Sequence, residues 1–70
     1  MILNGQKLRA AREAHGLSRP ALAEKVGVDP ATIKRIENGT MQPVVGKAAR
    51  IADALGVSLD SLLSPNGDSA

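Results

Sequence analysis

The chain contains no cysteine and no aromatic residue, and these absences exclude several kinds of protein. Without cysteine it cannot build a disulfide framework or a thiolate metal site. Without Phe, Tyr or Trp, any core has to consist of Leu, Ile, Val and Ala. No apolar run is long enough to span a bilayer, and no signal peptide is recognisable. We therefore expect no membrane partner, no metal, no cofactor and a cytoplasmic location.

Enzyme motifs are absent as well. The sequence has a single histidine, no glycine-rich phosphate loop and no evident pairing of a nucleophile with a base. A chain of 70 residues forms one small domain, which leaves little room for a catalytic pocket. We therefore expect no catalytic residues.

Charge is unevenly distributed along the chain. Residues 1–50 contain all nine Lys and Arg residues and four acidic residues, a formal charge of +5. Residues 51–70 contain three aspartates and no cation, a formal charge of −3. A basic body with an acidic end suits a polyanionic partner on one side of the molecule.

The most informative stretch is AEKVGVDPATIKRIENG at 23–39, which predicts a short helix, a tight turn and a second short helix. Ala23 supplies the small side chain needed where two helices cross closely. Gly27 can end the first helix with a positive φ at little steric cost. Asp29 is a good N-cap for the second helix, and Pro30 suits its first position.

The second of these helices has two different sides. Ile33 and Ile36, three residues apart, are expected to face the core, and Gly39 to end the helix. At about 100° per residue, the opposite side carries small, cationic and amide side chains, namely Pro30, Ala31, Lys34, Arg35 and Asn38. Such a side is either a surface for the DNA major groove or an ordinary solvated helix face.

Apolar spacing and capping signals predict an all-α fold, a compact five-helix bundle. The expected helices cover about 5–15, 19–26, 30–38, 45–55 and 59–63. The fourth should face the core with Val45, Ala48, Ala49, Ile51, Ala52 and Leu55. Residues 1–63 would form the domain, and residues 64–70, SPNGDSA, a flexible C-terminal tail.

An ordered set of segments resembles the Cro/repressor-type helix–turn–helix family, also called lambda-repressor-like or Xre. These segments are LRAAREAHGLSRPALAEKVGV at 8–28, TIKRIENG at 32–39, Pro43 and IADALGVSLDSLL at 51–63. The resemblance implies a bacterial or phage-encoded transcriptional regulator, most often a repressor. It also implies a homodimer on double-stranded DNA, with the third helix in the major groove and the dimer surface near residues 57–63.

The same resemblance assigns roles to individual residues. Base edges would be contacted by Pro30, Ala31, Lys34 and Arg35. Phosphates would be contacted by Ser18, Arg19, Asn38, Gly39 and Thr40. Arg12 and Glu37 would form a structural ion pair.

Some positions depart from the family pattern. Pro30 and Ala31 have no hydrogen-bonding side chain, whereas many relatives carry Gln, Arg or Ser there. Arg19 stands where glutamine is common, and the loop at 40–42 lacks the basic residues of many relatives. Specificity would then depend mainly on Arg35, whose guanidinium suits guanine O6 and N7.

Two alternatives to a DNA-binding regulator follow from these observations. The first is a protein-interaction module of the same fold, such as an antitoxin-like or anti-repressor partner, with weak or no DNA recognition. Pro30, Ala31 and the uncharged loop favour it. The second is an enzyme, for which the sequence offers no supporting motif.

Overall fold

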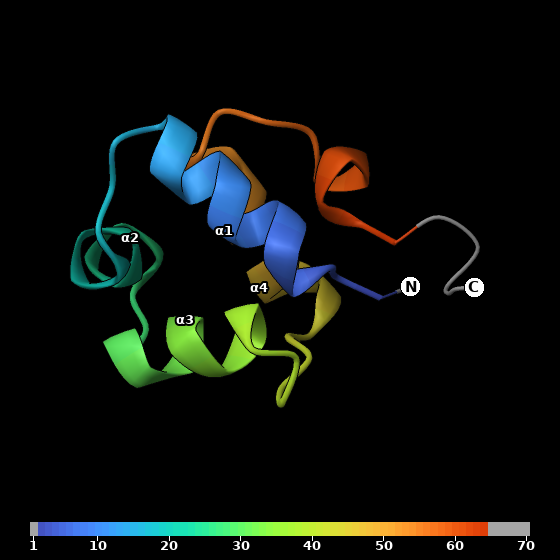
Figure 1. Cartoon of the computed structure of the whole chain (residues 1–70), viewed down its shortest axis with the longest axis horizontal. Helices are drawn as coiled ribbons and strands as arrows, with labels where there is room; N and C mark the ends of the chain where they lie inside the picture. Colours follow the sequence, from blue (N-terminus) through green and yellow to red (C-terminus); the bar gives the residue numbers. More distant parts are fainter. Residues whose placement is uncertain (1, 65–70) are drawn as a thin grey trace.

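The computed structural model describes residues 2–64 and consists of short helices joined by tight turns (Figure 1). Its elements are α1 (Gly5–Ala14), α2 (Arg19–Val26), α3 (Pro30–Glu37), α4 (Val45–Ala54) and the 3₁₀ helix η1 (Leu59–Leu62). The all-α class is therefore correct, but residues 2–64 contain four α-helices and one 3₁₀ helix rather than five α-helices. The last segment has only four residues after its cap, which favours i→i+3 bonds such as Ser61 N–H to Ser58 O at 3.1 Å.

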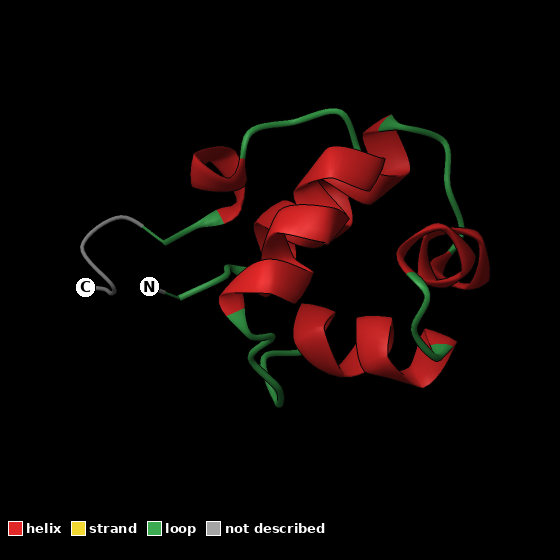
Figure 2. Cartoon of the chain, turned by 180° about the vertical axis from the view of Figure 1, so that it is seen from behind, coloured by secondary structure: helices red, strands yellow, loops and turns green. Residues whose placement is uncertain are grey.

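The helices surround one aliphatic core. Its largest fully buried side chains are Leu3, Leu8, Leu22, Ile33, Ile36, Ile51 and Leu62. In Figure 1, α1 lies in front of α4, α2 is seen end-on beside them, and α3 runs along the lower edge. Figure 2 shows the same arrangement from behind, with no helix below α3. One side of α3 is therefore uncovered by the other helices.

The expected inner stripe of α4 is partly wrong. Ala48, Ile51, Ala52 and Leu55 are buried, whereas Val45 is 62% exposed and Ala49 is also exposed. Ala49 lies about 100° around the helix from Ala48, which places it beyond the buried stripe. Val45 is in phase with the stripe, but it lies one turn before Ala48, where the core ends.

The two ends of the described segment pair with each other. Leu3 and Leu63 form an antiparallel bridge, and the Ser64 amide donates to the Ile2 carbonyl at 2.9 Å. On the other side of Leu3, the Gln42 side chain accepts from its N–H at 2.9 Å and donates to its carbonyl at 3.0 Å. Ser64, expected in the flexible tail, is thus hydrogen-bonded; the rest of that predicted tail, 65–70, lies outside the described residues.

The start of α1 contacts the end of α3 closely. A Cβ atom added at Gly5 would lie 2.3 Å from the Glu37 carbonyl oxygen and 2.7 Å from that of Ile36. Only glycine permits this approach, so Gly5 helps to determine where α3 ends. Among residues 2–64, no helix combines the length and apolar character needed to cross a membrane.

Candidate nucleic-acid interface

The turn between α2 and α3 follows from three residues. Gly27 has φ 85° and donates its N–H to the Ala23 carbonyl at 2.8 Å, which ends α2. Ala23 is 1% exposed, so a small side chain lies where the helices meet. Asp29 Oδ1 accepts from the Ala31 N–H at 2.8 Å and caps α3. The predicted helix–turn–helix is therefore present.

The inner and outer sides of α3 differ sharply. Ile33 and Ile36 are fully buried. The expected outward residues are all exposed, namely Pro30, Ala31, Lys34, Arg35 and Asn38. Neither Lys34 nor Arg35 forms a salt bridge with any residue that the structure describes. The helix thus exposes two cationic side chains to solvent. Its ribbon runs along the lower edge of the molecule in Figure 1, with no other helix below it.

At the end of α3, the backbone amides that follow the helix donate to carbonyl groups of its last turn. The Gly39 N–H donates to the Ile36 carbonyl at 3.1 Å, and the Thr40 N–H donates to the Arg35 carbonyl at 2.9 Å. The Thr40 hydroxyl also donates to the Arg35 carbonyl, at 3.2 Å. Gly39 and Thr40 are exposed, but the two amides expected to face phosphate already have acceptors. The exposed Asn38 side chain is the more available donor at this end.

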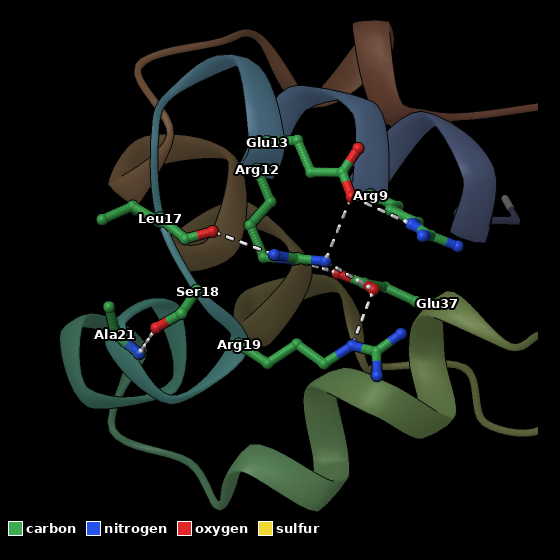
Figure 3. A network of polar contacts seen from close by, with 8 residues as sticks. All are labelled: Arg9, Arg12, Glu13, Leu17, Ser18, Arg19, Ala21 and Glu37. Carbon is green, nitrogen blue, oxygen red and sulfur yellow. Dashed lines mark hydrogen bonds and ion pairs between the residues drawn. The ribbon is translucent and has the colours of Figure 1, made fainter.

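A buried ion network connects α3 to the two preceding helices (Figure 3). Arg12 Nε donates to Glu37 Oε2 at 2.6 Å and Arg12 Nη2 to Glu37 Oε1 at 3.2 Å. Arg12 Nη1 donates to the Leu17 carbonyl at 2.9 Å. Arg12 and Glu37 thus form a fork-to-fork ion pair, with the Glu37 side chain only 1% exposed.

The contacts in this network shift the pKa values of Glu37 and Arg12. Burial by itself raises the pKa of Glu37, but the hydrogen bonds and positive charges of Arg12 and Arg19 outweigh it and hold that pKa below its ordinary value. The hydrogen bond to Glu37 raises the pKa of Arg12. Both shifts favour the ionised forms of Glu37 and Arg12.

Arg19 belongs to this network, which the sequence did not indicate. Its Nε donates to Glu37 Oε1 at 3.0 Å, and its side chain is 32% exposed. The phosphate contact of Arg19 stays a prediction, and the structure adds that the Arg19 side chain is attached to α3 through Glu37. Its neighbour Ser18 is exposed, and the Ser18 hydroxyl caps α2 by accepting from the Ala21 N–H at 3.2 Å. Local spacing does not indicate the Arg19 contact, because its partner is 18 residues away.

Features of other kinds of site are scarce on this molecule. Within the described segment, no three His, Cys, Asp or Glu residues are close enough to hold a metal ion. A shallow open groove lies between α2 and α4, lined by Lys25, Arg50, Asp53 and Ala54. These side chains are separate from the outward side of α3. The exposed cationic side of α3 is therefore the best candidate site.

Comparison with known proteins agrees with this geometry. A family model described as helix-turn-helix matches residues 8–62, which is most of the chain. This chain belongs to the helix–turn–helix family. Its predicted resemblance to Cro/repressor-type domains is confirmed.

One curated relative, from Sinorhizobium fredii, is an uncharacterised helix–turn–helix transcriptional regulator, 42% identical over 60 residues. The alignment covers 86% of this chain and 30% of that protein, so the chain spans less than a third of its length. The P22 c2 repressor, solved in complex with a synthetic operator, is 31% identical with a TM-score of 0.82, and the match covers 97% of this chain and all of that one.

The fold also occurs inside a substrate-bound protein. The structure of FeII HppE in complex with substrate matches with 32% identity and a TM-score of 0.83, covering 93% of this chain but 38% of that one. The fold therefore occurs both as a separate chain and as one part of a longer protein. The family match and the named regulator confirm the prediction of a DNA-binding transcriptional regulator. A second curated relative, from Methanocaldococcus jannaschii, is also named as a helix–turn–helix transcriptional regulator, with 38% identity over 56 residues, 80% of this chain and 85% of that one.

Proposed function

We propose that this chain binds double-stranded DNA sequence-specifically, with α3 in the major groove, and represses transcription. The proposal rests on the contrast between the buried and the exposed side of α3. Ile33 and Ile36 hold one side in the core, while Lys34 and Arg35 are exposed and without salt-bridge partners on the other, within the described residues. A short helix held in this way can enter a groove and contact base edges.

Each exposed residue of α3 has a proposed role. Arg35 donates two hydrogen bonds to a guanine, a contact worth about 1–3 kcal/mol of discrimination. Lys34 contacts a base edge or phosphate at the margin of the groove. Pro30 and Ala31, which are exposed at the start of α3, contact thymine methyl groups or permit close approach of the helix.

Phosphate contacts would lie at two places. One is the start of α2, where Ser18 is exposed and Arg19 is partly exposed. The other is the segment from Asn38 to Thr40 after α3, where the Asn38 side chain is the main donor. These contacts would fix the orientation of α3 without reading sequence.

The proposed active form is a homodimer on two half-sites. The side formed by α4 and η1, with residues 57–63, is the proposed dimer surface, because Val57, Leu59 and Leu63 are only partly buried. A two-fold axis between two such domains would require a palindromic operator. Analytical ultracentrifugation with and without the duplex would measure the assembly.

The experiment that tests DNA recognition is selection of bound duplexes from a random DNA pool. We expect a palindromic sequence with half-sites about one helical turn apart. The affinity for that duplex should fall steeply as salt rises, since phosphate binding releases counterions. No enrichment, together with no binding in dilute buffer, would refute the proposal.

A second candidate is a protein-interaction module, favoured by two exposed apolar side chains beside the interface. Val44 is 72% exposed and Val45 is 62% exposed, at the start of α4. A stable heteromer with another protein that survives the Arg35→Ala substitution would support this candidate.

A further inference from the structure

We infer that Glu37 is a positioning residue for Arg19, holding its guanidinium so that the terminal amino groups bind a DNA phosphate while Nε stays on the carboxylate. This inference rests on the proposed function. It assigns Arg19 a fixed bridging geometry instead of a loose electrostatic contact, and it gives Glu37 a part in DNA binding in addition to its pairing with Arg12.

The hydrogen bonds show how Arg12 and Arg19 share the Glu37 carboxylate. Arg12 uses Nε and Nη2 on Glu37 and Nη1 on Leu17, so all three of its nitrogens are engaged. Arg19 uses only Nε, at 3.0 Å from Glu37 Oε1. Its two terminal nitrogens have no hydrogen-bond partner in the described part of the chain, and they point away from the carboxylate in Figure 3.

The two arginines also differ in how far nearby carboxylates compensate their positive charge. Arg12 and Arg19 both contact the Glu37 carboxylate, and Arg12 Nη2 also lies 4.0 Å from Glu13 Oε2, so the positive charge with less compensation is that of Arg19. The Arg12 side chain is 9% exposed, whereas that of Arg19 is 32% exposed. The excess positive charge is therefore available to solvent at Arg19 and not at Arg12. An anion can therefore approach the network from the Arg19 side.

The first turn of α2 has few free backbone amides, which makes the Arg19 side chain more important for binding an anion there. Pro20 has no amide hydrogen, and the Ala21 N–H is already bound by the Ser18 hydroxyl. The Leu22 N–H donates to the Ser18 carbonyl at 3.0 Å. Few backbone amides of this turn remain for an anion, so the planar fork of Arg19 is the principal donor there.

The shared carboxylate also ties the phosphate contact to the recognition helix. Glu37 is the last residue of α3, and Arg19 is the first of α2. A phosphate bound by Arg19 is therefore held at a fixed offset from Lys34 and Arg35. A guanidinium can make both contacts at once, because Nε and the terminal nitrogens lie on different edges of one rigid plane.

The test compares Arg19→Lys and Arg19→Gln with wild type on the selected duplex, at several salt concentrations. Lysine keeps the charge but cannot bridge carboxylate and phosphate in the same plane, so we expect a loss of affinity of about tenfold for both variants. Arg19→Gln should also reduce the salt slope by about 0.9, the value for one phosphate contact. Arg9→Lys, at an exposed pair with Glu13, is the matched control and should change affinity less than twofold.

A DNA-independent readout is the NMR signal of the Arg19 Nε–H group. We expect it to be protected from solvent exchange in the free protein and to stay so when the duplex is added. Loss of the signal on DNA binding would show that Arg19 leaves Glu37, which overturns the inference. Thermal unfolding of each variant confirms that it is folded at the assay temperature.

The outcomes separate the two proposals. If Arg19→Lys binds like wild type and only Arg19→Gln is weak, Arg19 acts as a simple charge; the positioning role is then wrong while DNA binding stands. If neither variant changes affinity, Arg19 does not contact DNA, and the inference again fails. If the wild-type protein binds no duplex, the proposed function itself fails.

Discussion

The two sides of α3 both carry charge but hold it in opposite ways. On the inner side, Glu37 is buried and receives hydrogen bonds from two arginines. On the outer side, Lys34 and Arg35 are exposed and form no salt bridge with other described residues. A buried charge without partners is costly, so the inner charge determines stability. The outer charges cost little to leave unpaired, and they are available to a ligand.

This comparison separates folding from binding on a helix of eight residues. Changes on the inner side should mainly lower stability, and at Glu37 they should also weaken DNA binding through the loss of its contact with Arg19. Changes on the outer side should lower DNA affinity and leave stability nearly unchanged. The following predictions test whether the separation is as clean as the structure indicates.

The largest effect is expected for Glu37→Gln on the inner side. It removes the carboxylate that is hydrogen-bonded to the buried Arg12 and leaves Arg12 with only the longer 4.0 Å contact to Glu13, which costs about 3–5 kcal/mol of unfolding free energy. Domains of this size are themselves stable by only about 3–5 kcal/mol, so urea unfolding should be measured with a stabilising osmolyte present. Glu24→Gln, at an exposed glutamate of α2 that forms no salt bridge with other described residues, is the control and should cost less than about 1 kcal/mol. Equal losses in the two variants would contradict the buried pair.

The same carboxylate makes stability depend on pH. Its pKa is lowered in the folded protein, so its contribution is present above the unfolded glutamate pKa of about 4.3. That contribution is lost as the pH falls through the lower folded pKa. An NMR titration of the Glu37 carboxyl should therefore give a midpoint below about 4.3.

On the outer side, Arg35→Ala should weaken binding to the selected duplex by about 1–3 kcal/mol, or roughly 5- to 150-fold. Binding titrations measure this loss, and it should be greatest for the duplex with the preferred base at that position. The melting temperature should be unchanged, because Arg35 is exposed. Lys47→Ala on α4 is the charge-matched control. A comparable loss of affinity in the control would show that α3 has no special role.

Gly5→Ala tests whether the inner side also determines the position of α3. The added Cβ would meet the Glu37 carbonyl oxygen at 2.3 Å, so the end of α3 has to shift. We expect a loss of about 1–3 kcal/mol in chemical unfolding. Gly46→Ala is the matched control, since no atom lies within 4 Å of its added Cβ, and it should stabilise α4 by about 0.5–1 kcal/mol. Opposite signs for these two alanines would support the close contact at Gly5.

The smallest effect concerns α4, which unlike α1, α2 and α3 has no side-chain cap. Val44→Ser would supply an N-cap hydroxyl and should stabilise the domain by about 0.5–1 kcal/mol in thermal or urea unfolding. Val44→Ala is the control without a hydroxyl. If the serine variant is no more stable than the alanine variant, the missing cap does not limit α4.

The sequence by itself determined the local structure. Asp29, Gly27 and the pair Ile33 and Ile36 specify the turn and the two sides of α3, because capping, positive φ and helical spacing depend on neighbouring residues. The family resemblance, not the spacing, suggested the pairing of Arg12 with Glu37, and the structure contains that pair.

Only the tertiary structure decided how distant residues share partners. The attachment of Arg19 to Glu37, the pairing of Gln42 with Leu3 and the close approach of Gly5 to α3 join residues 18 or more positions apart. The exposure of Val45 has the same origin, because helical phase does not show where neighbouring helices end. Local rules fix how each helix forms, whereas packing fixes which polar atoms remain free to bind DNA.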